Sequence, residues 1–197
     1  MNNSPTRTET HSSPVNRSER MRFYINMNGA MDDGFVKHWI TPTVCIGDWR
    51  SSYTEFDVVV NANMPHNLIA HQKIGRMEET LNGRTCTLYL VGMYDSDTED
   101  LNGYLELLLP RLKKRYEQDP NTTFLFHCFA GKSRSVVIAL AFLVEVMGMT
   151  FEAAYELVKT KRPIIEPRPS FIEGLRPLTA SPLDISKLTI TTSPLKI

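Results

Sequence analysis

Two apolar runs separated by a short polar loop dominate the second half of the chain. The first run, Phe124-Leu125-Phe126, follows the turn residues Asp119-Pro120-Asn121, and the second extends from Val136 to Val144. A short apolar run after turn residues is typical of a buried strand, and a longer one is typical of a buried helix. The sequence therefore predicts a strand, a loop and a helix in immediate succession.

The loop carries reactive side chains, in the order His127-Cys128-Phe129-Ala130-Gly131-Lys132-Ser133-Arg134-Ser135. A helix that starts here directs its unpaired N–H groups and the positive end of its dipole at the loop, which favours an anion. A thiol in such surroundings ionises more readily than a free cysteine, and a guanidinium matches the oxygens of phosphate. Cys128 and Arg134 therefore predict a thiolate nucleophile beside a phosphate-binding arginine.

If the loop catalyses phosphate transfer, most of its residues have an expected role in the reaction. The backbone N–H groups of residues 129–134 would hold the phosphate oxygens, with a bidentate contact from Arg134. The Ser135 hydroxyl would reach the Cys128 sulfur and help it leave a phosphocysteine intermediate, and Gly131 would allow a conformation that a Cβ opposes. This chemistry requires no metal and no cofactor. An exposed thiolate of this kind is also easily oxidised.

A plainer interpretation competes with this one. A lone cysteine is most often a buried structural residue, and the loop would then be an ordinary strand–helix turn. Arg134, Gly131 and Ser135 at their offsets favour the functional interpretation. His127 either orients the loop or is a packed core histidine.

The rest of the chain alternates between predicted strands and helices. Strands are expected at 40–48, 57–62, 87–91 and 124–126, the second because its β-branched run suits a strand buried on both faces. A helix should begin at Ser96, which with Glu99 fits a capping box, and Pro110 should kink or cut it. Further helices are expected from Ser135 to Met147, stopped by Gly148, and after Thr150.

This alternation indicates an α/β fold, with a central mostly parallel sheet flanked by helices. Ligands of such sheets bind at the carboxyl ends of the strands, where Cys128 falls. Residues 65–84 show no clear pattern beyond a turn at Asn82-Gly83. Residues 1–21 and 177–197 are polar and are expected to be flexible tails around a catalytic domain at 22–176.

Composition excludes several classes of partner. Lys+Arg and Asp+Glu number 22 each, so nothing global indicates nucleic acid, and any basic field must be local. The three cysteines are far apart and lack metal-like spacing with the five histidines, which favours a reducing compartment and no zinc site. No apolar run is long enough for a transmembrane segment. A cytoplasmic location is expected, with a nuclear or mitochondrial one left open.

The pattern His127-Cys128-x-x-Gly131-x-x-Arg134-Ser135 resembles the active-site loop of the cysteine-dependent protein tyrosine phosphatases, specifically their dual-specificity branch. Residues 40–48 and 57–62 resemble that branch's first two strands. Arg162-Pro163, with Pro167 and Phe171, resembles the segment behind the loop. The resemblance covers about residues 22–176 and implies that fold, together with removal of phosphate from tyrosine and from serine or threonine in proteins.

The family also implies a general acid aspartate ahead of the helix that precedes the loop strand. The candidates are Asp95, Asp97 and Asp100, and the position of Asp95 before Leu101 and Tyr104 matches the family pattern best. Asp97 is the main alternative. With Ser96 as the helix N-cap, however, Asp97 would fall in the first helical turn, where a carboxylate ordinarily complements the dipole.

Three positions depart from the family pattern. Arg168 and Gly174 stand where Asn and Gln are usual, and Arg168 is either a second phosphate contact or a solvated surface arginine. Lys132 resembles members that act on phosphoinositides, but those usually have a second Lys where this chain has Phe129. A phosphoinositide or other lipid phosphatase is therefore the alternative function. An inactive phosphoprotein-binding module is disfavoured, because Cys128 and Arg134 are both present.

Overall fold

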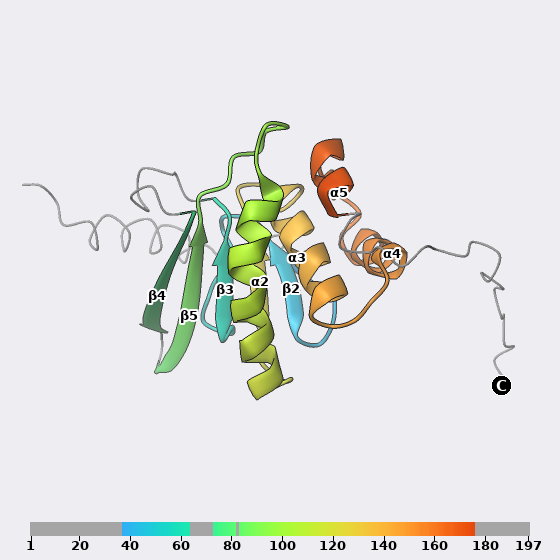
Figure 1. Ribbon diagram of the computed structural model, residues 1–197. Helices are drawn as coiled ribbons and strands as arrows, with labels where there is room; N and C mark the ends of the chain where they lie inside the picture. Colours follow the sequence, from blue (N-terminus) through green and yellow to red (C-terminus); the bar gives the residue numbers. More distant parts are fainter. Residues whose placement is uncertain (1–36, 64–72, 82, 176–197) are drawn as a thin grey trace, which may run out of the picture.

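A six-stranded sheet forms the centre of the molecule, in a computed structural model that describes residues 37–63, 73–81 and 83–175 (Figure 1). The strand order is β1-β2-β6-β3-β5-β4. The strands are β1 (Lys37–Trp39), β2 (Val44–Gly47), β3 (Val58–Asn61), β4 (Ile74–Leu81), β5 (Arg84–Val91) and β6 (Phe124–His127). Strands β2, β6, β3 and β5 are parallel, and the two edge strands are antiparallel to their neighbours. The prediction of a mostly parallel sheet is confirmed.

Four strands fall where apolar runs predicted them, and two others, β1 and β4, are additions. All four residues of β3 are buried, as the β-branched run indicated. Strand β4 was not predicted. It alternates between half-buried and exposed residues and forms a hairpin with β5, in which Gly83 has a φ of +79°. The turn assigned to Asn82-Gly83 is therefore supported at Gly83, while Asn82 lies outside the described residues.

Helix α2 (Leu101–Gln118) begins later than predicted. Its N-cap is Asp100, whose carboxylate accepts from Gly103 N at 3.1 Å, so the capping box at Ser96 is wrong. The Glu99 carboxylate instead accepts from Tyr94 N at 3.0 Å. Asp100 prevails because its side chain lies three residues before a free helical N–H, as an N-cap requires.

Pro110 does not cut this helix, which continues to Gln118. Proline inside a helix costs about 3 kcal/mol because it removes one hydrogen bond and crowds the preceding turn. Leu108 and Leu112, on either side of it, are fully buried. Burial of each leucine stabilises the helix by roughly 1.5–3 kcal/mol, which offsets the cost of the proline.

Two of the remaining three helices follow the predicted signals closely, and the last one was not predicted. Helix α3 (Arg134–Glu145) is followed by Gly148 with a φ of +74°. Helix α4 (Phe151–Lys161) is capped by Thr150, which accepts from Ala153 N at 3.2 Å, and α5 (Pro169–Leu175) closes the described chain. The predicted tails at 1–21 and 177–197 lie outside the described residues.

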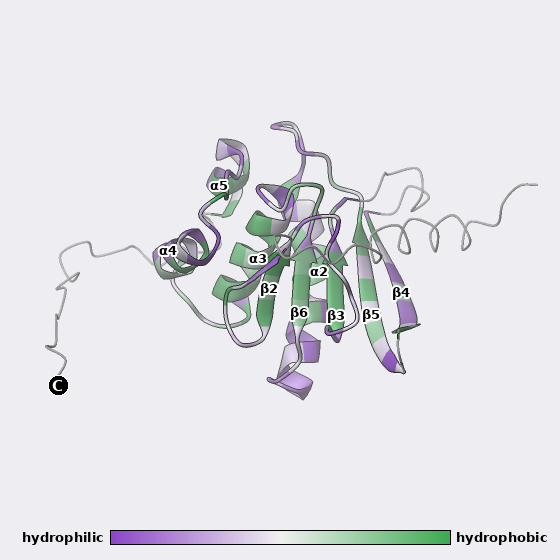
Figure 2. Cartoon of the chain, turned by 180° about the vertical axis from the view of Figure 1, so that it is seen from behind, coloured by the Kyte–Doolittle hydropathy of each residue, from purple (hydrophilic) through white to green (hydrophobic). Residues whose placement is uncertain are grey.

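Helices α2 to α5 lie on one side of the sheet, as the two opposite views show (Figures 1 and 2). The larger apolar core fills the space between these helices and the sheet. The other face carries a second buried cluster, in which Tyr53 and Phe56 from the β2–β3 connection pack against Cys45, Val59 and Leu125. Strand β6 is therefore buried on both faces, and the loop that follows it starts from a rigid base.

Candidate active site

The loop from Cys128 to Ser133 joins the buried carboxyl end of β6 to the first turn of α3. Cys128 lies at its floor and is 2% exposed, so the expectation of an exposed thiolate is wrong. Phe129 is 60% exposed at the mouth, and Ala130 and Lys132 are also exposed. The nucleophile candidate is therefore almost entirely shielded from solvent, beside exposed side chains of its own loop.

Four consecutive carbonyl oxygens of the loop accept hydrogen bonds from neighbouring segments. The donors are Trp49 N to Phe129 at 3.2 Å, Arg162 Nη2 to Ala130 at 3.3 Å, Arg162 Nε to Gly131 at 2.7 Å and Glu166 N to Lys132 at 2.9 Å. Within the described part of the chain, none of the N–H groups of residues 129–134 donates to a protein acceptor. A loop with its carbonyls engaged by its surroundings and its N–H groups unused is built to receive an anion.

Gly131 is required by this conformation. Its φ is +64°, and a Cβ there would lie 2.5 Å from both Arg162 Nη2 and the Gly47 carbonyl oxygen. Arg162 itself is 1% exposed, and burial lowers the pKa of its guanidinium. Its charge is satisfied by the two loop carbonyls and by a 3.3 Å contact between Nη1 and His38 Nδ1. Arg162 thus fixes the loop from behind.

The Cys128 sulfur accepts a hydrogen bond from the buried Ser135 hydroxyl at 3.3 Å, as the sequence predicted. Arg134 reaches over the loop and donates through Nη1 to the carbonyls of Ala62 at 2.9 Å and Met93 at 3.3 Å. Its Nε is buried and makes no hydrogen bond among the described residues. Anchoring one side of the guanidinium leaves Nε as a donor for a bound anion.

His127 is fully buried below the loop, where burial lowers its pKa to about 4. Its Nε2 lies 2.6 Å from the Tyr53 hydroxyl, which also accepts from Asn61 Nδ2 at 3.3 Å. The imidazole is therefore neutral at ordinary pH and belongs to a buried polar network. This arrangement suits a residue that supports the loop and does not itself transfer protons.

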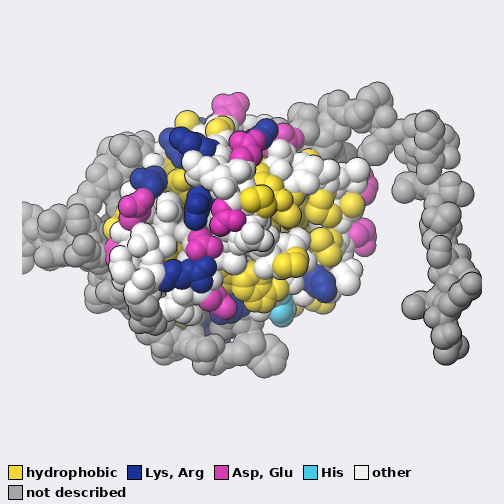
Figure 3. All heavy atoms as spheres, turned by 90° about the horizontal axis from the view of Figure 1, so that it is seen from below, with side chains coloured by type: hydrophobic (Ala, Val, Ile, Leu, Met, Phe, Trp, Pro, Cys, Tyr) yellow, Lys and Arg dark blue, Asp and Glu magenta, His cyan; other side chains and the backbone are white. Residues whose placement is uncertain are grey.

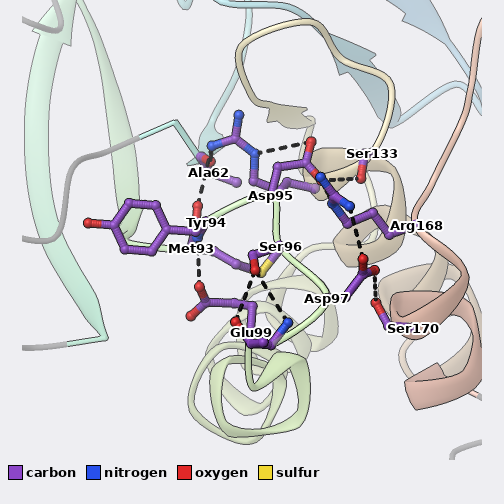
Figure 4. A network of polar contacts seen from close by, with 12 residues as sticks. Ala62, Met93, Tyr94, Asp95, Ser96, Asp97, Glu99, Ser133, Arg168 and Ser170 are labelled. Atoms are coloured by element: carbon purple, nitrogen blue, oxygen red, sulfur yellow. Dashed lines mark hydrogen bonds and ion pairs between the residues drawn. The ribbon is translucent and has the colours of Figure 1, made fainter.

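Of the three aspartates, Asp95 is the one that contacts the loop (Figure 4). It accepts from the Ser133 hydroxyl at 2.9 Å, and its Oδ2 lies 3.9 Å from Arg134 Nε. Asp97 points to α5 and accepts from Ser170 Oγ at 2.8 Å. Asp100 is the α2 N-cap. The geometry therefore favours Asp95 as the acid candidate.

Arg168 connects the two neighbouring aspartates. Its Nε donates to Asp95 at 2.9 Å and its Nη1 to Asp97 at 3.2 Å, so the guanidinium fixes the loop before α2 to the start of α5 (Figure 4). Arg168 is thus a surface arginine, with 39% of its side chain exposed, that is held by two aspartates. Gly174 packs against Leu101, where a Cβ would make an ordinary 3.6 Å contact.

Sequence reasoning missed the functions of Arg162 and Tyr53. Arg162-Pro163 was identified as part of the segment behind the loop, but no pattern indicated that this arginine is buried. Tyr53 lies in a connection without periodicity. Its hydrogen bond to His127 spans 74 positions in the sequence, so no local signal could have revealed it.

Known proteins resemble this chain over most of its length. The family model "dual specificity phosphatase, catalytic domain" matches residues 45–180. Dual specificity protein phosphatase 1 of Arabidopsis thaliana is 36% identical over 92 residues, which cover 47% of this chain and 46% of the relative. The chain thus spans less than half the length of that relative.

Solved structures show the same fold. Human DUSP28 superposes with a TM-score of 0.59 at 22% identity, over 76% of this chain and 97% of that one. PTPMT1 in complex with PI(5)P superposes with a TM-score of 0.54 at 20% identity, over 73% and 94%. The matched family model, together with the Cys128 loop that it contains, identifies the chain as a member of the dual specificity phosphatase family, within the cysteine-dependent protein tyrosine phosphatase superfamily.

Proposed function

We propose that this chain hydrolyses phosphate monoesters of tyrosine and of serine or threonine in proteins, through a phosphocysteine intermediate. The observation that carries the proposal is the loop after β6. It holds the Cys128 sulfur at its floor, 3.3 Å from the Ser135 hydroxyl, below a row of unused backbone N–H groups. Such a site binds a phosphate dianion and places phosphorus in front of sulfur.

In the first step the Cys128 thiolate attacks phosphorus, and the bond from phosphorus to the substrate oxygen breaks. The backbone N–H groups and Arg134 stabilise the equatorial oxygens, on which charge spreads in the transition state. Asp95 gives its proton to the leaving oxygen, which therefore departs as a neutral hydroxyl. Asp95 approaches Arg134 to 3.9 Å, which supports its assignment to this side of the site.

In the second step a water attacks the phosphocysteine and Asp95 takes one of its protons. The sulfur–phosphorus bond breaks, inorganic phosphate leaves, and Cys128 is restored as a thiolate. The Ser135 hydroxyl donates to that sulfur, and this hydrogen bond strengthens as negative charge returns to it.

Phosphoinositides are the second candidate substrate class. Lys132 is exposed at the mouth of the loop, where its ammonium could contact a further phosphate on an inositol ring. One structure of the same fold, PTPMT1, was solved with PI(5)P. Against this, Phe129 places an apolar side chain, 60% exposed, beside the opening, which suits a peptide or an aromatic ester better.

Purified protein assayed on phosphotyrosine and phosphothreonine peptides, and in parallel on short-chain phosphoinositides, tests the assignment. We expect peptide turnover, abolished by Cys128→Ser. Turnover of the lipid without turnover of either peptide would overturn the proposal, and Lys132→Ala should then remove most of the lipid activity.

We further propose a cytoplasmic or nuclear location, which suits phosphoprotein substrates. All three cysteines are buried and unpaired, which supports a reducing compartment. No helix within the described ranges is long and apolar enough to span a membrane. Imaging of the tagged full chain in cells tests this expectation, and retention in mitochondria would refute it.

A further inference from the structure

A basic pocket lies between the last two turns of α2 and the sheet, at the opposite end of the parallel strands from Cys128. Its volume is about 400 Å³. It is lined by Val58, Arg76, Thr87, Tyr89, Arg111, Lys114, Arg115 and Gln118. Half of these residues are cations and none is acidic. Because basic and acidic residues balance over the whole chain, a basic field can only be local, and this pocket is such a local basic field.

The sequence builds the pocket from two elements. Arg111, Lys114, Arg115 and Gln118 follow the spacing i, i+3, i+4, i+7, which places them on one face of α2. Arg76 faces them from β4, where its register partner is Tyr89 of β5. Val58 and Tyr89 are buried and form the floor. The cations therefore surround a preformed hollow with an apolar base, and are not simply spread over a convex surface.

The positive charge of this pocket is poorly compensated within the described residues. Arg76 pairs with Glu78 at 2.6 Å, and Arg111 donates to the Leu107 carbonyl of its own helix. Lys114 and Arg115 form no side-chain hydrogen bond or ion pair with the described residues. Like charges at i, i+3 and i, i+4 destabilise a helix. An anion between them would remove this repulsion.

The surrounding surface distinguishes the pocket from a uniformly basic face. Figure 3 shows this end of the molecule, with Lys and Arg side chains interspersed with acidic ones over one half of the face and apolar side chains over the other. A macromolecule with a broad negative surface would meet those acidic groups. A compact ligand that enters the pocket would meet its four cations and no acidic lining residue.

We propose that this pocket binds a small anion that carries two or more phosphoryl groups. Three of the four cations are arginines, whose guanidinium forks match phosphate oxygens in a bidentate manner. The volume falls in the range of about 300–1,000 Å³ that small ligands occupy. A free organic polyphosphate and the headgroup of a phosphorylated lipid share this chemistry.

Inorganic tripolyphosphate is the probe, titrated calorimetrically into the full chain after the Cys128 loop has been saturated with orthovanadate. Vanadate occupies the catalytic loop, so the remaining heat reports a second site. We expect one tripolyphosphate per chain. Lys114→Glu should weaken its binding about tenfold or more, because a charged hydrogen bond is lost and a repulsion is gained. Lys113→Glu is the matched control, since Lys113 is exposed on the same helix and does not line the pocket.

The proposal is overturned if the vanadate-saturated protein binds no tripolyphosphate, or if Lys113→Glu weakens binding as much as Lys114→Glu does. If Lys114→Glu does not fold, Arg111→Gln replaces it, with the same expectation. Sedimentation with vesicles that contain phosphatidylinositol bisphosphate separates the two sources. If the wild type binds these vesicles and Lys114→Glu does not, the ligand is a lipid headgroup. If the wild type binds tripolyphosphate but not the vesicles, the ligand is a free polyphosphate.

Discussion

Replacing Arg168 with glutamine tests whether this arginine positions Asp95, on the loop before α2, or contacts the substrate. Arg168 holds Asp95 at 2.9 Å and Asp97 at 3.2 Å, and its side chain is 39% exposed. Ion pairs at such exposure contribute about 0.2–1 kcal/mol each. Their combined loss of roughly 0.4–2 kcal/mol lowers the equilibrium constant for docking of the loop before α2 by a factor of about 2 to 30.

The assay compares two aryl phosphates that differ in their leaving group. Phenyl phosphate needs a proton from Asp95 for its leaving oxygen, whereas p-nitrophenyl phosphate releases a stabilised anion that needs little help. If Arg168 positions Asp95, Arg168→Gln lowers kcat on phenyl phosphate by up to that factor and leaves kcat on p-nitrophenyl phosphate nearly unchanged. The Ser133–Asp95 hydrogen bond remains in the variant, which keeps the loss moderate.

Arg84→Gln is the matched control. It removes an ion pair with Asp57 at 2.7 Å, at the far end of the sheet, and should leave both rates unchanged. A substrate contact by Arg168 would instead raise KM for both esters equally. An equal loss on the two substrates, or no loss relative to Arg84→Gln, would refute the positioning role.

Three further changes test other parts of the site. Asp95→Ala should lower kcat by about 10²-fold or more on phenyl phosphate, and a larger loss in Asp97→Ala would reverse the assignment of the acid. Gly131→Ala should lower the free energy of unfolding by at least about 1–2 kcal/mol from its positive φ alone, and should greatly reduce activity. Gly174→Ala is the control and should be tolerated, because its Cβ would make an ordinary 3.6 Å contact. Equal melting temperatures of the two variants would contradict this account. Because His127 has a folded pKa of about 4 against 6.5 when unfolded, the unfolded state takes up the proton first, and stability should fall by up to about 3 kcal/mol as the pH drops from 6.5 to 4. The free energy of unfolding, measured by urea melts at each pH, should fall more steeply with decreasing pH in the wild type than in His127→Asn. Parallel plots against pH would show that His127 does not titrate in that range.

The loop and its flanking elements could be predicted because their signals are local. Apolar runs set β6 and α3, and the positions of Cys128, Ser135 and Arg134 follow from the geometry of one strand-to-helix junction. The resemblance to the phosphatase family ranked Asp95 above Asp97, whereas the supporting argument that Asp97 lies in the first helical turn was wrong, because Asp100 is the N-cap of α2. The physical reason, the contacts of Asp95 with Ser133 and Arg134, becomes visible only when the two segments are brought together.

Elements at the sheet edge and the arginines behind the loop could not be predicted in the same way. Strand β4 has one face exposed, where Arg76 and Glu78 obscure the apolar pattern of Met77 and Leu81. In the sequence Arg162 is a charged residue at the end of a predicted helix, which suggests an exposed side chain. It is buried because its guanidinium donates hydrogen bonds to loop carbonyls 31 and 32 positions away. Long-range polar contacts of this kind leave no periodicity in a sequence.

The central claim is that Cys128 carries the phosphoryl group during turnover. Ser135→Ala removes the hydrogen bond that helps the sulfur leave, so breakdown of the intermediate should become rate-limiting. Rapid acid quench of this variant during turnover of p-nitrophenyl phosphate, followed by peptide mass spectrometry, should reveal a phosphoryl adduct on Cys128 that is absent from Cys128→Ser. An active Cys128→Ser protein, or an adduct on any other residue, would contradict the account.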